Sequence, residues 1–273
     1  MKRFIVILTM LLFIILPAAA QEDLPPGCNI GTLANLFTDM GENIGGVDLA
    51  AADAVYFIDE LTEALTATRN ACDDDQPIAE GAIDYSAIEQ SRTEDGAFVL
   101  GAPDAPITIV EFADFMCPHC QTYHTTVQDV IKNYVATGQA KFEYRFFPVV
   151  DPTYSPFTAR MVECADILQP GSFWNAHDVM YDLTTNQFTS FSLYTFAARV
   201  GLDFDEMVTC AQESANQVET DTELAQTMEI TGTPSVMVRY DDGDLEDIVV
   251  DGESVGRSSV PLLVLASIIE DAQ

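Results

Sequence analysis

The residues best suited to chemistry in this chain are two cysteines separated by two positions, in the segment Cys117-Pro118-His119-Cys120. The segment follows an apolar strand-like run and begins a predicted helix at 118–136, so Cys117 lies at the start of that helix. Unpaired N–H groups and the helix dipole at this end favour a thiolate. Pro118 suits the first helical turn, and His119 adds electrostatic support for an anion.

Cys120 lies one helical turn after Cys117, within disulfide reach. We therefore expect thiol–disulfide exchange, in which Cys117 attacks or leaves through a mixed disulfide and Cys120 resolves that intermediate. A stabilised Cys117 thiolate favours the reduced form, so the disulfide should be oxidising and should be donated to substrates. The alternatives are a structural disulfide and part of a metal site, because Cys120 and His124 are four residues apart on one helix.

The elements around the two cysteines predict a β-α-β unit. Short segments of strand character at 97–100 and 107–112 precede the helix, and the alternating segment 141–147 follows it, so the crossover joins parallel strands. The remaining elements indicate an α/β sandwich with a helical insertion. In order, these elements are a helix-rich stretch at about 156–230, strands at 235–240 and 247–250 joined by a hairpin turn, and a final helix at about 259–271.

Residues 1–20 are typical of a secretory signal peptide. Lys2 and Arg3 precede an apolar core of 13 residues, and a small-residue segment, Ala18-Ala19-Ala20, comes before Gln21. The apolar core is shorter than the roughly 20 residues that a membrane-spanning helix needs. We therefore expect an extracytoplasmic protein, periplasmic or secreted, with an uncleaved signal anchor as the alternative.

Residues 21–75 predict a helical hairpin, because two segments of helical periodicity flank a Gly-Gly pair. Such a hairpin brings Cys28 near Cys72, so we expect a structural disulfide between them. An acidic, proline-containing stretch follows and predicts a linker over residues 76–95, before a domain at 96–273.

Composition excludes some classes of protein. The chain has 273 residues, with 44 acidic and 11 basic side chains, a net charge of −33 and 48% hydrophobic residues. The hydrophobic content is too high for a disordered acidic chain. No basic cluster follows Lys2 and Arg3, which argues against nucleic-acid binding and against anionic membrane surfaces.

Four motifs together resemble the DsbA-like thiol:disulfide oxidoreductases of the thioredoxin fold. They are the turn Gly101-Ala102-Pro103-Asp104-Ala105-Pro106, the strand 107–112, the Cys-Pro-His-Cys segment and Thr231-Gly232-Thr233-Pro234. The resemblance spans about Ser91 to Glu270. It implies an α/β, thioredoxin-like fold with a helical insertion, here preceded by the N-terminal helical hairpin.

The resemblance also implies roles for the Thr-Pro pair. Pro234 would be a cis-proline packed against the cysteines, and the backbone of Thr233 would pair with an extended substrate peptide. An ordinary trans turn is the alternative at this proline.

Further residues match the family pattern. Glu111 matches a buried acid that would accept the proton of Cys120, and a carboxylate facing water is the alternative. Cys164 and Cys210 match a cysteine pair of the family and imply a second structural disulfide, with two free thiols or a regulatory redox pair as alternatives. His177, on an amphipathic helix, is expected to be a core histidine rather than a ligand.

The resemblance implies an exported dithiol oxidase that forms disulfides in unfolded or reduced secreted proteins. It requires no metal or organic cofactor, and a DsbB-like or quinone-linked membrane partner would reoxidise the cysteines. Threonine before the presumed cis-proline occurs in oxidases and also in isomerases or reductases of the superfamily, so a disulfide reductase or isomerase is the enzymatic alternative. From other classes, the alternatives are a copper- or zinc-binding protein that uses the CxxC cysteines and a non-catalytic interaction domain.

Overall fold

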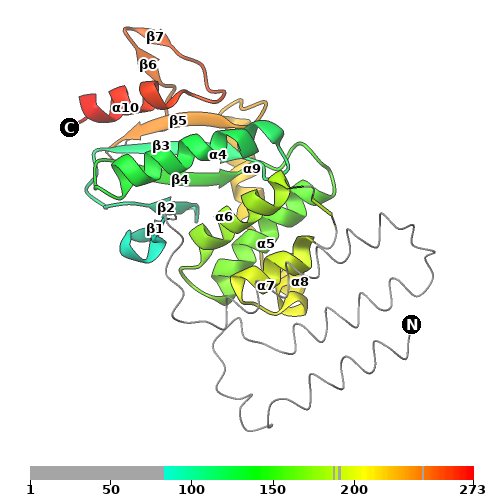
Figure 1. Cartoon of the computed structure of the whole chain (residues 1–273). Helices are drawn as coiled ribbons and strands as arrows, with labels where there is room; N and C mark the ends of the chain where they lie inside the picture. Colours follow the sequence, from blue (N-terminus) through cyan, green and yellow to red (C-terminus); the bar gives the residue numbers. More distant parts are fainter. Residues whose placement is uncertain (1–82, 187, 190–191, 242) are drawn as a thin grey trace, which may run out of the picture. The chain divides into compact units, whose positions relative to one another are not determined.

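The computed structural model describes residues 83–273, except for residues 187, 190, 191 and 242 (Figure 1). The expected signal peptide, the expected helical hairpin with Cys28 and Cys72, and the first part of the expected linker lie outside the described residues. The described residues fall into two compact units, one with residues 83–186 and 209–273 and the other with Phe188–Val208. The candidate active site lies in the first of these units.

A five-stranded mixed sheet forms the centre of the first unit (Figure 1). Its strands are β1 (Gln90–Arg92), β2 (Phe98–Leu100), β3 (Ile107–Ala113), β4 (Lys141–Phe146) and β5 (Ser235–Tyr240), in the order β1-β2-β4-β3-β5. β3 runs parallel to β4 and antiparallel to β5. All seven residues of β3 are buried, as expected for a central strand covered on both faces.

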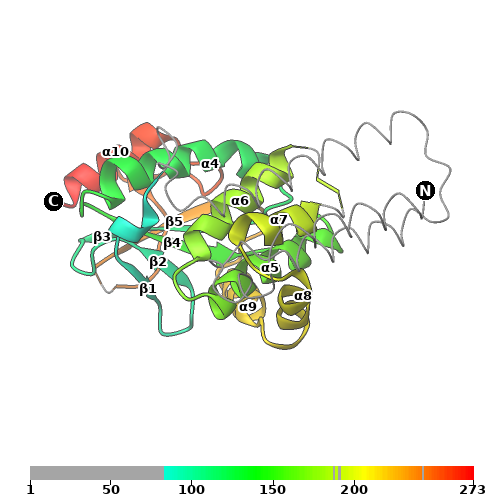
Figure 2. The same ribbon diagram turned by 60° about the horizontal axis from the view of Figure 1, so that its bottom comes forward.

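Helices cover both faces of this sheet (Figures 1 and 2). α4 (Pro118–Val130) and α10 (Leu262–Asp271) lie on one face, and α9 (Gln217–Thr227) lies on the other. A π-helical turn, Ile131–Val135, extends α4 toward β4. The predicted β-α-β unit from β3 through α4 to the parallel strand β4 is therefore confirmed.

The alternation of side chains along β3 separates the two faces. Val110 and Phe112 pack with Ala225 of α9 and with Met237 of β5 in one hydrophobic cluster. Glu111 lies between them in sequence, so its side chain points to the opposite face, which α4 covers.

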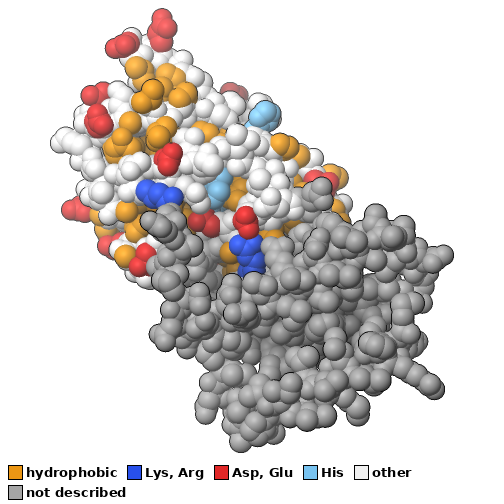
Figure 3. All heavy atoms as spheres, in the orientation of Figure 1, with side chains coloured by type: hydrophobic (Ala, Val, Ile, Leu, Met, Phe, Trp, Pro, Cys, Tyr) orange, Lys and Arg blue, Asp and Glu red, His pale blue; other side chains and the backbone are white. Residues whose placement is uncertain are grey.

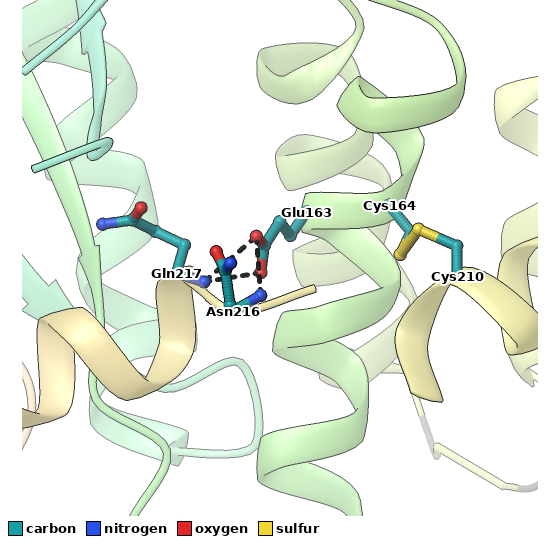
Figure 4. The surroundings of a disulfide bond; sticks show 5 residues. All are labelled: Glu163, Cys164, Cys210, Asn216 and Gln217. Carbon is teal, nitrogen blue, oxygen red and sulfur yellow. Dashed lines mark hydrogen bonds between the residues drawn. A yellow bond between two sulfur atoms is a disulfide. The ribbon is translucent and has the colours of Figure 1, made fainter. Parts of the chain in front are cut away.

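The helical insertion of the predicted fold is confirmed. After β4 come α5 (Tyr154–Leu168), α6 (Phe173–Thr185), α7 (Ser192–Val200), α8 (Phe204–Glu213) and then α9. Cys164 of α5 and Cys210 of α8 form a disulfide with an S–S distance of 2.02 Å, the pairing that the family resemblance implies (Figure 4).

The residue before this cysteine ties α5 to a second helix. Glu163 points away from the disulfide and toward the start of α9 (Figure 4). Its carboxylate accepts hydrogen bonds from the backbone N–H groups of Asn216 at 3.1 Å and Gln217 at 3.0 Å. A carboxylate at this position satisfies unpaired N–H groups and complements the helix dipole.

Two expectations about strands differ from the structure. β1 lies within the expected linker 76–95, yet it pairs with β2, so the sheet begins before residue 96. Residues 247–250 were expected to pair with 235–240, but in the described part of this region β5 instead forms an isolated bridge from Val238 to Glu246, just before that segment. β6 (Val249–Val250) instead pairs with β7 (Glu253–Ser254).

The turn between β6 and β7 explains the second difference. Asp251 and Gly252 have φ values of 53° and 83°. Two positive φ values in an Asp-Gly loop are typical of the type I′ hairpin turn, whose twist matches the flanking strands. The Asp-Gly turn therefore explains why β6 pairs with β7, the segment that follows it.

Acidic side chains are spread over the described part of the face that Figure 3 shows. Several acidic side chains of the described residues form ion pairs with basic ones, for example Asp166 with Arg92 at 2.7 Å and Asp247 with Arg257 at 2.5 Å. None of the helices in the described residues combines the length and the apolar character that spanning a membrane requires.

Candidate active site

The two cysteines of the motif lie where β3 leads into α4. Cys117 is the N-cap of α4 and has extended backbone angles, and Pro118 is the first helical residue. The carbonyl oxygen of Cys117 accepts the N–H of Gln121 at 3.0 Å. Both motif thiols are free, with Cys117 4% exposed and Cys120 fully buried.

The sheet brings a distant segment to this helix start. β3 and β5 are antiparallel neighbours, with Phe112 opposite Ser235, so the residues after β3 meet the residues before β5. The Thr233–Pro234 peptide bond lies directly before β5 and is cis. The thiol of Cys117 donates a hydrogen bond to the carbonyl oxygen of Thr233 at 3.3 Å. The structure thus places the motif and the Thr-Pro pair together.

Several donors stabilise a thiolate at Cys117. A hydrogen bond from the thiol of Cys120 is the largest cause that lowers the pKa of Cys117, to about 5. Thr233 and the backbone N–H groups of Cys120 and His119 lower it further, while burial opposes the shift. His119 lowers the pKa of Cys117 through its backbone N–H, and its side chain is exposed. These donors are the unpaired groups of a helix N-terminus.

The environment of Cys120 has the opposite effect. Burial raises the pKa of the Cys120 thiol well above its ordinary value, and the hydrogen bond to Cys117 and the charge of Glu111 raise it further. Cys120 therefore stays protonated under conditions in which Cys117 is a thiolate.

Glu111 is 1% exposed, so the alternative of a carboxylate facing water is wrong. Burial raises the pKa of Glu111 to about 8, and the charge of Cys117 adds to the shift. Its Oε1 has no hydrogen-bond partner among the described residues. Such a group is equipped to exchange a proton near neutral pH.

Asp114 is a site residue that the sequence analysis missed. Its buried carboxylate accepts the N–H of Met116 at 2.9 Å, and of Val149 and Val150 at 2.9 and 2.8 Å. Its carbonyl oxygen accepts the N–H of Cys117 at 3.0 Å. The sequence signal for this contact is an Asp two residues before Met116, a spacing that allows an Asx turn. Asp114 therefore links the loop that contains Cys117 with the loop that follows β4.

A metal site at the cysteines would need His124 to lie beside Cys120, but His124 lies beside Asp178 instead. Nε2 of His124 lies 3.3 Å from Oδ1 of Asp178 on α6. Within the part of the chain that the structure describes, no group of three metal-binding side chains includes Cys117 and Cys120. His177 is fully buried, and Nδ1 lies 3.2 Å from Oδ1 of Asp178, in line with the expected core position.

Comparison with protein families and curated proteins supports this description. Residues 93–244 match the family described as Thioredoxin. Disulfide bond formation protein D of Bacillus subtilis is 28% identical over 164 residues, which cover 56% of this chain and 72% of that protein. Na(+)/H(+) antiporter NhaA 3 of Salinispora tropica is 28% identical over 164 residues, but these are only 24% of the antiporter. The chain thus spans about a quarter of that relative.

Solved structures share the fold. BdbD from Bacillus subtilis, in its oxidised form, matches with a TM-score of 0.52 and 22% identity, over 64% of this chain and 91% of BdbD. Alpha-DsbA1 from Wolbachia pipientis matches with a TM-score of 0.54 and 20% identity, over 66% of this chain and 92% of alpha-DsbA1. At these identities the likeness concerns the fold.

Proposed function

Because this chain belongs to the thioredoxin family, whose match covers more than half of its residues, we propose that Cys117 and Cys120 catalyse thiol–disulfide exchange. The protein acts as a dithiol oxidase that forms disulfides in secreted proteins. The observation that carries the proposal is the contrast between the two thiols. Cys117 lies at the N-cap of α4 beside Thr233 and has a pKa of about 5, whereas burial keeps Cys120 protonated.

The first step begins from the Cys117–Cys120 disulfide. A substrate thiolate attacks Sγ of Cys117, the intramolecular S–S bond breaks, and the electron pair goes to Sγ of Cys120. A mixed disulfide between the substrate and Cys117 forms. Attack at Cys117 is favoured because Cys120 is the more deeply buried sulfur.

The second step releases the oxidised substrate. A second substrate thiolate attacks the substrate sulfur of the mixed disulfide, and Cys117 leaves as a thiolate. Its pKa of about 5 makes it a good leaving group at neutral pH. The substrate has lost two electrons and two protons. The Cys117–Cys120 pair has gained the two electrons and one proton, and the second proton goes to solvent.

Glu111 supplies the proton that Cys120 takes up in the first step, and it regains a proton from solvent afterwards, so the overall proton balance is unchanged. Its raised pKa, to about 8, keeps it protonated at neutral pH, and its charge interactions with both cysteines support its proximity to them. In the reverse reaction the same carboxylate accepts the proton from Cys120 when the Cys117–Cys120 disulfide forms again.

The backbone beside the cis-proline is the docking element for substrate. The carbonyl oxygen of Thr233 lies next to the reactive sulfur, and an extended peptide that pairs with this segment would bring its own cysteine to Cys117. Pro118 and His119 are exposed beside the sulfur and complete the surface that a substrate approaches.

The proposed direction of reaction follows from the stability of the two redox forms. Interactions that stabilise the Cys117 thiolate exist only in the reduced protein, so they make its disulfide a stronger oxidant. The name of the Bacillus relative, a disulfide bond formation protein, agrees with this direction. Substrates are then reduced or unfolded secreted proteins. A DsbB-like or quinone-linked membrane protein reoxidises the dithiol. The reaction takes place outside the cytoplasm, and the exchange requires no metal or organic cofactor.

The test combines an activity and an equilibrium. The oxidised full-length protein is incubated with a reduced, unfolded model protein, and loss of substrate thiols is measured. We expect one substrate disulfide per oxidised chain, none with Cys117→Ser, and normal yield with the control Cys164→Ser/Cys210→Ser. Equilibration with glutathione should give a potential nearer to about −120 mV than to about −270 mV. A potential near about −270 mV would show that the protein acts as a disulfide reductase and not as an oxidase.

A further inference from the structure

A cluster of side chains on α4 and α6 lies outside the machinery described above. His124 of α4 and His177 and Asp178 of α6 offer three ligand atoms that all lie within 4.8 Å of one another. Nε2 of His124 is 3.3 Å, and Nδ1 of His177 is 3.2 Å, from the same carboxylate oxygen, Oδ1 of Asp178. Two imidazoles and one carboxylate thus converge on one point between two helices.

The spacing of these atoms suits a metal ion. In a tetrahedral zinc site with bonds of about 2.0 to 2.2 Å, neighbouring ligand atoms lie about 3.3 Å apart. The two nitrogen–oxygen distances of 3.3 and 3.2 Å are close to this length, and the two ring nitrogens lie within 4.8 Å of each other. We propose that His124, His177 and Asp178 bind one zinc ion, which clamps α6 of the helical insertion onto α4.

Hydrogen bonds alone satisfy this cluster poorly. Nε2 of His124 lies 3.3 Å from Oδ1 of Asp178 and also 3.3 Å from the amide nitrogen of Gln128. The carboxylate requires a donor at this nitrogen, whereas the Gln128 amide nitrogen requires an acceptor. A bound cation supplies the positive charge that the carboxylate requires, because the nitrogen then directs its lone pair to the ion. The Gln128 amide must then rotate, so that its oxygen and not its nitrogen faces the site.

On the side of each imidazole that faces away from Asp178, no contact with a described residue determines whether the ring nitrogen carries a proton. Nδ1 of His124 and Nε2 of His177 are buried and have no hydrogen-bond partner within the described residues. No acceptor or donor there holds either ring in one tautomer. Both rings can therefore present a lone pair on the side that faces Asp178.

A second layer of contacts orients the carboxylate. The hydroxyl of Tyr85 donates a hydrogen bond to Oδ2 of Asp178 at 2.7 Å, which leaves Oδ1 for the ion. Such outer contacts are typical of metal sites. The fourth position is left for water or for the Gln128 side-chain oxygen after rotation of its amide. Asp178 is 24% and His124 is 12% exposed, so an ion can enter from solvent.

The test uses the oxidised full-length protein, in which the active-site thiols form a disulfide and cannot bind metal. The protein is dialysed against zinc with excess Mg²⁺, which occupies the acidic surface groups without competing for imidazole. We expect one tightly held zinc per chain and a rise in melting temperature of about 5 to 10 °C at a zinc concentration near 100 times the Kd. Co²⁺ in place of zinc should give the visible absorption of a tetrahedral site.

Matched variants identify the ligands. His124→Gln and Asp178→Asn should each lose at least tenfold in zinc affinity, and both positions are partly exposed, so folding is checked by circular dichroism. His119→Gln replaces the remaining histidine of the chain and should bind zinc normally. The proposal would be overturned if the unaltered protein binds no zinc or if both ligand variants retain zinc binding. It would also be overturned if His119→Gln loses zinc binding to the same extent as the ligand variants. The disulfide-exchange activity plays no part in these readouts.

Discussion

Sγ of Cys117 and the carbonyl oxygen of Thr233 lie 3.3 Å apart, although 116 positions separate the two residues in the chain. The thiol donates in this contact, so the hydrogen bond is lost when Cys117 ionises. The Thr233 hydroxyl is buried and has no partner in the described thiol form, and it lowers the pKa of Cys117 by donating to the thiolate. One residue therefore contacts the reactive sulfur in both protonation states.

We predict that Thr233→Val raises the pKa of Cys117 by roughly one unit, because the variant keeps the backbone carbonyl and loses the hydroxyl donor. The measurement is the pH dependence of thiolate absorbance in the ultraviolet, together with the equilibrium with glutathione. The variant should be a weaker oxidant. Thr231→Val, at an exposed position nearby, is the control and should leave both values unchanged. An unchanged pKa in Thr233→Val would exclude the hydroxyl as a donor.

The reactivity of Cys117 should depend on pH with a midpoint near 5. Alkylation of the reduced protein by iodoacetamide, followed by mass spectrometry of the modified peptide, measures the profile. The thiolate reacts, so the rate rises through the pKa as pH increases and is level at neutral pH. A midpoint near the ordinary thiol value of about 8.5 would contradict the proposed stabilisation.

Replacement of Cys120 separates its hydrogen bond from the other donors. Cys120→Ser retains a donor to Cys117, whereas Cys120→Ala removes the largest cause that lowers the pKa. The midpoint of alkylation should therefore shift upward by roughly one to two units in the alanine variant and less in the serine variant. Equal shifts in the two variants would assign the low pKa mainly to the backbone N–H groups.

Glu111→Gln should stabilise the protein in a pH-dependent way. Below about pH 4.5 the carboxyl is protonated in both the folded and the unfolded state, so no difference arises. Between that value and about 8 the unfolded state loses the proton and the folded state keeps it, which makes folding progressively less favourable. The penalty at pH 7 is on the order of 3 kcal/mol, and the variant removes it.

Urea unfolding of the reduced Glu111→Gln protein at pH 4.5 and at pH 7 tests this sign, and the exposed Glu94→Gln is the control. The same variant should slow disulfide exchange, because Gln cannot donate a proton to the departing Cys120. A variant that is less stable at pH 7 than the unaltered protein would show that Glu111 is ionised in the folded state.

Asp114→Ala should destabilise the protein by roughly 3 kcal/mol or more. The substitution leaves three backbone N–H groups of Met116, Val149 and Val150 without their charged acceptor. Urea unfolding measures the loss, and Asp104→Ala at an exposed position should be nearly neutral. Because the loop that carries Cys117 loosens, the exchange rate should also fall. Full stability in Asp114→Ala would mean that water replaces the carboxylate at little cost.

Loss of the Cys164–Cys210 disulfide should lower the free energy of unfolding by about 4 kcal/mol, because the bond closes a long loop in the unfolded chain. Chemical unfolding of Cys164→Ser/Cys210→Ser at neutral pH tests this value. The pKa of Cys117 should not change in this variant. A change would show that the bond acts on the active site and is more than a structural link.

The local sequence alone determined where Cys117 lies. An apolar strand followed by Cys-Pro and a helical pattern is sufficient to predict a cysteine at a helix N-terminus, because these preferences involve neighbouring residues only. The same kind of reasoning predicted the β-α-β unit and the helix-rich insertion. It missed β1, which is short and polar, and it missed the Asp-Gly hairpin turn at Asp251 and Gly252.

The tertiary structure alone decided which distant groups surround that cysteine. The antiparallel register of β3 and β5 places Thr233 at the sulfur, and the packing of α9 against Val110 and Phe112 turns Glu111 toward α4. The contact between His124 and Asp178 joins two helices that are separate in sequence. Such pairs depend on how whole elements pack, and alternation along a strand does not by itself show which face is covered by which helix.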